Sequence, residues 1–134
     1  MAKTKRVIYF KAQIEDKPGA LLALAKDLKE KKLDLIALKG VGQAGRGDIL
    51  AIAKNEDKLR EAWKGAGILV EEGLAFLLTG TDSTGALVAS LETLTNVGVN
   101  IAALEAIGVG GKYGAVVWVS PEDVEKTAKA LKVK

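Results

Sequence analysis

The segment Asp16-Lys17-Pro18-Gly19-Ala20-Leu21 decides the fold, because it returns as Asp82-Ser83-Thr84-Gly85-Ala86-Leu87 at an offset of 66 residues, from 16 to 82. The same offset aligns identical residues on both sides of the segment: Phe10 with Phe76, Leu28 with Leu94, Ala37-Leu38 with Ala103-Leu104, Gly42 with Gly108, and Gly45 with Gly111. The alignment needs no gap in any element. The chain is therefore predicted to be a tandem repeat.

Each copy shows the same succession of patterns. An apolar run of strand length leads into the polar turn, an amphipathic helix follows, and a second strand, a glycine-rich hairpin, a third strand and a second helix complete the copy. The expected strands cover residues 7–14, 33–39, 48–53 and 68–72 in the first copy, and 74–79, 99–107 and 113–119 in the second. Asp16 or Asp82 can cap the first helix of its copy, and Pro18 suits a first helical turn.

A βαββαβ order predicts the α+β class: two ferredoxin-like modules in tandem, with antiparallel sheets and both helices on one face. We expect the first module at residues 1–72 and the second at 73–134, with no flexible linker between them. The second copy ends at Lys134, the counterpart of Ile68, so its fourth strand is missing. Because open sheet edges are usually covered, we expect another chain or the N-terminal segment to cover this one.

The amino-acid composition excludes several classes of catalytic and metal site. The 134 residues include no His and no Cys, which excludes Cys–His and Ser–His–Asp nucleophiles, disulfides and ordinary zinc sites. The net charge is only +3, and the lysines at 26–32 are typical of a solvated helix face. No apolar run approaches the about 20 residues of a membrane span. We expect a cytoplasmic protein that is not an enzyme, with no metal, no cofactor, no nucleic acid and no membrane partner.

Three short patterns are interpreted as structural. The residues Gly40 to Gly45 match GxGxxG, but a strand follows them where a dinucleotide site needs a helix, so we predict a hairpin. Glu71 and Glu72 alternate across a strand and should point to opposite faces, which prevents an acid–base pair. Trp63 and Trp118 are expected to be packing residues.

The turn and helix at Asp16-Lys17-Pro18-Gly19-Ala20-Leu21 resemble the ACT domain, the amino-acid-sensing module of aspartate kinase and related enzymes. The segment Gly98-Val99-Asn100-Ile101 at the second strand of the second copy adds to this resemblance, which covers nearly the whole chain twice. It implies a stand-alone, non-catalytic regulatory protein that binds a small molecule, expected to be an amino acid. It also implies that turn residues and second-strand residues meet across an interface between two modules.

The expected ligand contacts have a physical rationale. A turn glycine admits close approach to the backbone, a helix start favours a carboxylate, and an Asn amide both donates and accepts hydrogen bonds. Asp34 replaces Asn100 in the first copy and would repel a carboxylate, so the second copy is the better predicted site. The predicted ligand-binding residues are Asp82, Ser83, Thr84, Gly85, Ala86, Asn100 and Ile101, with Asp16, Lys17, Pro18, Gly19, Ala20 and Asp34 as counterparts.

Two other functions stay open at this stage. The chain can be a regulatory subunit that contacts a separate enzyme of amino-acid metabolism, and its partners then include that enzyme or a second copy in a homodimer. It can also be a ferredoxin-like RNA binder, whose sheet stacks bases on exposed aromatic side chains. The predicted third strand of the first copy, residues 48–53, has no aromatic residue, which argues against RNA.

Overall fold

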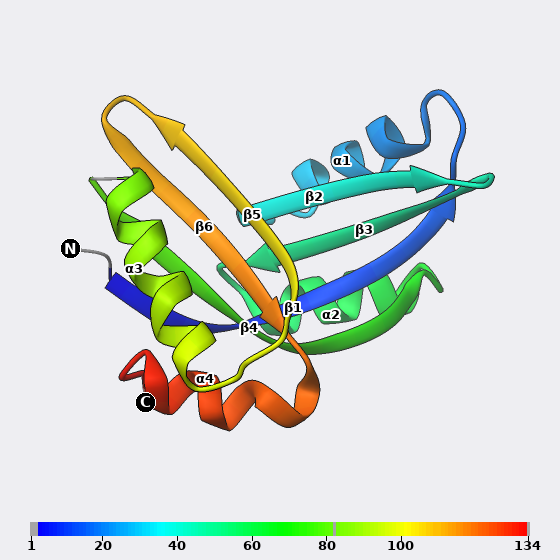
Figure 1. Cartoon of the computed structure of the whole chain (residues 1–134). Coiled ribbons are helices and arrows are strands. Elements are labelled where there is room, and N and C mark those ends of the chain that lie inside the picture. The colour runs from blue at the N-terminus through cyan, green and yellow to red at the C-terminus, as the bar shows by residue number, and fades with distance from the viewer. Residues whose placement is uncertain (1–2, 82, 134) are drawn as a thin grey trace. The chain divides into compact units, whose positions relative to one another are not determined.

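The computed structural model describes residues 3–81 and 83–133, apart from the side chains of Gln43 and Ser83. The described chain is an α+β structure of strands and helices (Figure 1). Its elements are β1 (Lys3–Glu15), α1 (Ala20–Glu30), β2 (Leu35–Gln43), β3 (Arg46–Ala53), α2 (Glu56–Gly65), β4 (Leu69–Gly80), α3 (Ser83–Asn96), β5 (Ile101–Val109), β6 (Lys112–Val119), a 3-10 turn (Pro121–Asp123) and α4 (Val124–Ala130).

The strands follow the hydrogen-bonded order β2-β3-β1-β4-β6-β5. The chain divides into two compact units, one of residues 8–73 and one that joins residues 3–7 to residues 74–133. Strands β1 and β4 each contribute to both units. The predicted fourth strand of the first copy and first strand of the second are one continuous strand, β4. These findings confirm the predicted α+β class with ferredoxin-like βαββαβ modules in tandem.

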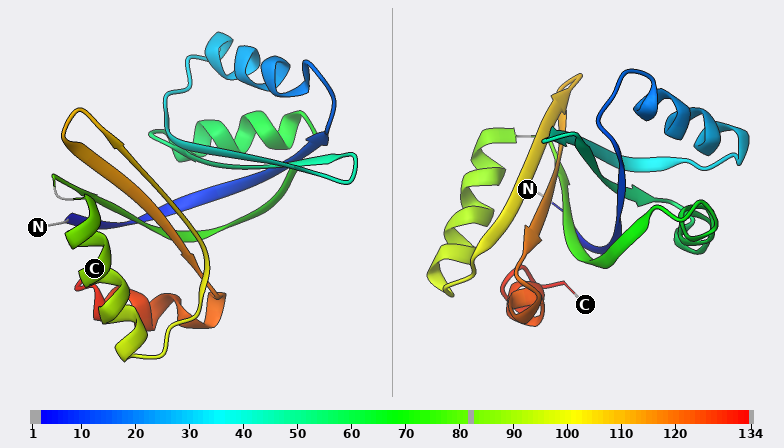
Figure 2. Two further views of the ribbon diagram at one scale, coloured as in Figure 1. Left: turned by 45° about the horizontal axis from the view of Figure 1, so that its top comes forward. Right: turned by 90° about the vertical axis from the view of Figure 1, so that its right-hand side faces the viewer.

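The unit of residues 8–73 has the strand order β2-β3-β1-β4, and its two helices lie on one face of these strands (Figure 2). Alternate residues of β3 point to that face, as the strand period of two requires. They meet the apolar stripes of α1 and α2 in a core built around Phe10, Leu24, Leu28, Ile49, Ala51, Leu59 and Trp63. Trp63 is 1% exposed, which confirms its role as a packing residue.

The second unit takes its fourth strand from the N-terminus. Its strand order is β1-β4-β6-β5, and its core gathers Phe76, Leu78, Leu94, Tyr113, Ala115, Val117, Val119 and Ala128. Val7 of β1 is 5% exposed, and Arg6 Nη1 lies 3.1 Å from Glu125 Oε1 of α4. The N-terminal segment of the same chain therefore occupies the edge that lacks a fourth strand, one of the two predicted possibilities.

The first helix of each copy begins at a different point of the repeat. Helix α1 begins at Ala20 after Gly19, which has φ 88° and lies in the left-handed region, and no side chain caps the helix. The prediction that Asp16 caps α1 and that Pro18 lies in its first turn is therefore wrong. Pro18 disfavours helical backbone at Lys17, and the left-handed Gly19 ends the turn, so the helix begins after both.

In the second copy, α3 begins at Ser83, so the residues expected to form a turn up to Gly85 are helical instead. Thr84 stands where the first copy has Pro18, and it places no restriction on the residue before it. The helix can therefore extend back by about one turn. Asp82, the other predicted cap, lies outside the described residues.

The GxGxxG segment is a hairpin, as predicted. Gln43 pairs with Arg46, and the two residues between them, Ala44 and Gly45, have φ angles of 52° and 79°. The second copy repeats this turn at Gly110 and Gly111, with φ angles of 57° and 80°. A two-residue turn with positive φ at both positions matches the twist of the flanking strands, which explains the glycines.

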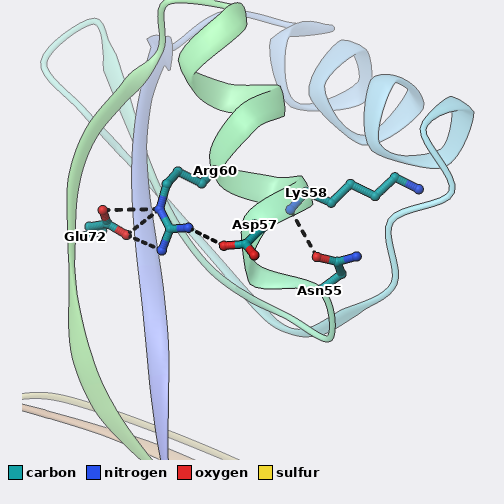
Figure 3. A network of polar contacts seen from close by, with 5 residues as sticks. All are labelled: Asn55, Asp57, Lys58, Arg60 and Glu72. Atoms are coloured by element: carbon teal, nitrogen blue, oxygen red, sulfur yellow. Dashed lines mark hydrogen bonds and ion pairs between the residues drawn. The ribbon is translucent and has the colours of Figure 1, made fainter.

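Glu71 and Glu72 point to opposite faces of β4, as predicted. Glu72 accepts hydrogen bonds from Arg60 of α2, whose Nη2 lies 3.0 Å from Glu72 Oε2 and whose Nη1 lies 2.7 Å from Asp57 Oδ1 (Figure 3). Glu71 instead accepts a hydrogen bond of 2.8 Å from the Tyr9 hydroxyl. Burial and this bond to Glu71 raise the pKa of Tyr9 to about 12. Arg60 thus ties α2 to β4 on the helical face.

No helix within residues 3–81 and 83–133 combines the length and the apolar character that crossing a membrane requires.

Candidate ligand-binding site

The turn between β1 and α1 lies against the hairpin of β2 and β3 in the unit of residues 8–73. The amide of Asp16 donates a 3.1 Å hydrogen bond to the carbonyl of Gly45 at the hairpin tip. The Asp16 carboxylate lies over Gly42, where a Cβ atom would be 2.8 Å from both carboxylate oxygens. Glycine at position 42 therefore allows the carboxylate to lie directly on the strand.

A small cavity opens beside this contact, with a volume of about 160 Å³. Its wall on the hairpin side consists of backbone and apolar side chains, and its rim on the turn side is polar. The lining residues are Ile14, Glu15, Asp16, Lys17, Ala20, Leu21, Gly40, Val41, Gly42, Gly47 and Ile49. The size suits a small molecule of a few heavy atoms or one end of a larger one.

Some charged side chains at the rim of the cavity form ion pairs within the protein and others do not. Lys17 Nζ pairs with Glu15 Oε2 at 2.9 Å, and both side chains are largely exposed. Among the described residues, no cationic side chain pairs with Asp16. The carboxylate of Asp16 is therefore the group on the rim that a ligand ammonium can neutralise.

The first turn of α1 follows the cavity at Ala20. A helix start presents backbone N–H groups and a partial positive charge, and here no side chain caps it. A ligand carboxylate would be favoured at this end of the helix. The turn thus places the Asp16 carboxylate near the partially positive N-terminal end of α1. The carboxylate complements the ammonium of a zwitterion, and the helix end complements its carboxylate.

The structure brings together only part of the predicted first-copy set. Asp16, Lys17 and Ala20 line the cavity, whereas Pro18 and Gly19 are exposed in the turn and do not line it. Asp34 follows α1 at its other end, and an 11-residue helix is about 16 Å long. The turn residues and Asp34 therefore do not converge within one module.

Asp34 lines a different cavity of about 360 Å³ at the C-terminal end of α1. Its carbonyl accepts a 3.0 Å hydrogen bond from the amide of Lys54, which fixes the entry into β2. The cavity combines an apolar floor with charged groups, and its lining residues are Ala25, Leu28, Lys29, Lys32, Leu33, Asp34, Leu35 and Leu38.

The predicted second-copy residues also fall at the two ends of one helix. Ser83, Thr84, Gly85 and Ala86 form the first turn of α3, where Thr84 and Gly85 are exposed and Ala86 packs against the core. Asn100 and Ile101 follow the helix at its far end. The backbone N–H of Asn100 donates a 3.1 Å hydrogen bond to Asp123 Oδ2, and Ile101 packs on the core.

The sequence interpretation missed the hairpin wall of the 160 Å³ cavity. Gly40, Val41 and Gly42 were explained by the hairpin alone. The available signal was Gly42, which aligns with Gly108 although it lies inside a strand and not in the turn. A glycine within a strand indicates close approach of another group, and here that group is Asp16.

Within the described residues, no group of three or more Asp or Glu side chains is placed to hold a metal ion.

Comparison with known proteins rests on structure. No model of a known protein family matches the sequence, and no curated protein sequence matches it significantly. Protein BT0572 from Bacteroides thetaiotaomicron superposes with a TM-score of 0.84 at 22% identity, over 96% of this chain and 88% of that one. The ligand-free regulatory subunit of aspartate kinase from Thermus thermophilus superposes with a TM-score of 0.65 at 16% identity, over 98% and 95%.

This chain has the fold of an aspartate kinase regulatory subunit. A C-terminal regulatory domain of aspartate kinase from Porphyromonas gingivalis W83 gives the same result, with a TM-score of 0.58 at 11% identity over 98% of this chain and 94% of that one. These neighbours fit the ACT-type fold that the turn segments resemble. At such identities, the likeness concerns the fold.

Proposed function

We propose that the chain is a non-catalytic regulatory protein of ACT type that binds a free amino acid. The observation that carries the proposal is the Asp16 carboxylate, held over Gly42 at a cavity beside the uncapped start of α1. A carboxylate attracts the ammonium of the ligand, and the helix start attracts its carboxylate. The solved regulatory subunits and domains of aspartate kinase with the same fold support a regulatory role.

Turn residues supply one part of the proposed site. Asp34, Asn100 and Ile101 lie at the far ends of their helices, so they supply contacts only to a ligand held by the turn of a partner module, as the ACT resemblance implies. The cavity at the turn of the first copy is the better half-site, because its hairpin wall and carboxylate are already in place. This reverses the preference for the second copy that Asn100 suggested.

A thermal-shift and calorimetric screen of the common amino acids tests the proposal. A ligand at about one hundred times its Kd stabilises the native state by about 2.7 kcal/mol, so one amino acid or a small related group should raise Tm. Asp16→Asn keeps the shape of the side chain and removes its charge, and we expect it to weaken binding about tenfold or more.

Asp27→Asn is the matched control. Asp27 is also on the α1 side of this unit, where it pairs with Lys31 at 2.7 Å, but it does not line the 160 Å³ cavity. It should bind like the wild type. The proposal fails if no amino acid binds at about 10 mM, a concentration above the millimolar Kd of a weak complex, or if Asp16→Asn binds unchanged.

The regulated activity belongs to a separate enzyme of amino-acid metabolism in this proposal. Solved neighbours include aspartokinase α and β subunits, with a TM-score of 0.56 at 13% identity. Affinity purification of the tagged chain from its native cells, with and without the identified amino acid, should recover that enzyme in a ligand-dependent amount. Recovery of no enzyme under either condition would remove this part of the proposal.

A further inference from the structure

The hairpin wall of the 160 Å³ cavity includes the glycines Gly40, Gly42 and Gly47. In the pairing of β2 with β3, Gly40 lies opposite Ile49 and Gly42 lies opposite Gly47. Residues that are directly opposite or two apart share a face of the sheet, so all three glycines lie on the face of the core residue Ile49. Their φ angles lie outside the left-handed region, so the backbone conformation does not require glycine. The glycines instead leave space above the sheet.

Aliphatic side chains surround this space. A Cβ atom at position 40 would lie 3.3 Å from Ile49 Cδ1, and one at position 47 would lie 3.2 Å from Ile14 Cγ1. Leu21 of α1 also lines the cavity and is 46% exposed, so it leaves apolar surface for a ligand to cover. Glu15 and Lys17 pair with each other at 2.9 Å and are largely exposed, so these two charges lie at the rim. The wall around Ile14 and Ile49 is therefore apolar.

The second copy fills the corresponding place with a side chain of its own. Tyr113 stands where the first copy has Gly47, at the offset of 66 residues (113 minus 47). Tyr113 lies between Gly80 and Gly108 in the strand pairing, and it is 4% exposed in the core of its unit. In the first copy, Gly47 leaves this place open, and Ile14, at the position of Gly80, narrows it. The remaining space therefore suits a side chain smaller than that of tyrosine.

We propose that the first copy selects an amino acid with a branched aliphatic side chain, such as valine, leucine or isoleucine. The ligand side chain packs over Gly40 and Gly47, in contact with Ile14 and Ile49. The Asp16 carboxylate holds the ligand ammonium. This inference rests on the proposed function and adds the class of amino acid. The cavity volume of about 160 Å³ lies below the about 300–1,000 Å³ of pockets for drug-sized ligands, which favours a ligand of this small size.

Calorimetric titration with matched amino acids tests the selectivity. L-valine and L-threonine have nearly the same shape and differ by one methyl group against one hydroxyl group. An apolar wall offers the hydroxyl no hydrogen-bond partner, so L-valine should bind about 10- to 100-fold more tightly than L-threonine. L-alanine lacks two of the methyl groups of L-valine and should bind at least about tenfold more weakly than L-valine. L-lysine and L-aspartate carry charges that the apolar wall cannot pair, so they should also bind more weakly than L-valine.

Gly40→Ala tests where the ligand side chain lies. The second copy carries Ala106 at this position (106 minus 40 is 66), and the added methyl group meets only the end of the Ile49 side chain, so the variant should fold. The methyl group narrows the cavity, so L-valine should bind at least about tenfold more weakly than to the wild type. Gly65→Ala is the matched control, because it makes the same change at the end of α2, away from the cavity and with no neighbouring atom within 4 Å. It should leave the affinity unchanged.

The outcomes separate this inference from the proposed function. Equal affinity for L-valine and L-threonine, or tighter binding of L-lysine or L-aspartate, would overturn the aliphatic selectivity and leave amino-acid binding in place. A folded Gly40→Ala variant, established by circular dichroism, that binds L-valine like the wild type would overturn the placement of the ligand side chain. Binding of no amino acid at all would overturn both proposals.

Discussion

The two copies of the repeat start from nearly the same segment and build different turns. In the unit of residues 8–73, α1 begins only after Pro18 and the left-handed Gly19. The turn before the helix places Asp16 against the hairpin at Gly42. In the other unit, Thr84 lets α3 begin at Ser83, so the equivalent turn is absorbed into the helix. Pro18 disfavours helical backbone at Lys17, which is consistent with the later start of α1 and with a turn that can line a cavity.

The copies also differ in where their fourth strand comes from. The unit of residues 8–73 uses β4, which follows its second helix directly in the chain. The unit of residues 74–133 uses residues 3–7, which precede everything else. The sheet of the first unit is therefore completed by a strand that is close in sequence. The sheet of the second unit is completed by a strand that is distant in sequence.

Deletion of residues 1–7 should have the largest effect and should fall on one unit. It removes the buried Val7, whose burial alone contributes about 1.5–3 kcal/mol, and the strand pairing with β4. Hydrogen exchange should show lost protection in β6 and α4 and retained protection in β2, β3 and α1. Arg6→Gln is the control, because it removes the ion pair to the exposed Glu125 but keeps the strand and the buried Val7, so it should cost less than the deletion. Equal loss of protection in both units would contradict the division.

Alanine at the two equivalent glycines should shift stability in opposite directions. Gly19 has φ 88°, so Gly19→Ala should lower the free energy of unfolding by about 1–2 kcal/mol. Gly85 lies in the first turn of α3, so Gly85→Ala should raise it by about 0.5–1 kcal/mol. Urea denaturation measures both changes. Shifts of the same sign would show that the two helix starts are alike after all.

The last difference between the copies is an alkaline loss of stability at Tyr9 of the first unit. Tyr9, with its pKa raised to about 12, corresponds to Ala75 in the second copy. The folded state holds the Tyr9 proton more tightly than the unfolded state, so this contribution is complete below about pH 10 and is lost as pH rises from about 10 to about 12.

Tyr9→Phe isolates that contribution. The difference in unfolding free energy between wild type and variant should shrink between about pH 10 and about pH 12, because other titrating groups affect both proteins alike. Urea denaturation at each pH provides the measurement. A difference that stays constant over this range would show that the bond to Glu71 does not hold the Tyr9 proton in the folded state.

Much of this architecture could be predicted from the sequence, because it depends on local preferences and on periodicity. The repeat offset predicted the tandem modules, alternation predicted the strands, and Gly45 and Gly111 predicted the hairpins. The opposite faces of Glu71 and Glu72 followed from the strand period alone. Parts of the candidate site were also predicted, since Asp16, Lys17 and Ala20 do line a cavity.

Only the tertiary structure decided the rest, because the interactions concerned join residues far apart in the chain. It determined which of two possible partners covers the edge of the second unit, through the position of β1 beside β4. It placed Gly42 under the Asp16 carboxylate, and it separated Asp34 from the turn by the length of a helix. A sequence pattern indicates which face of a helix or strand a residue occupies. The residues that pack against that face are determined only by the folded structure, because they come from distant parts of the chain.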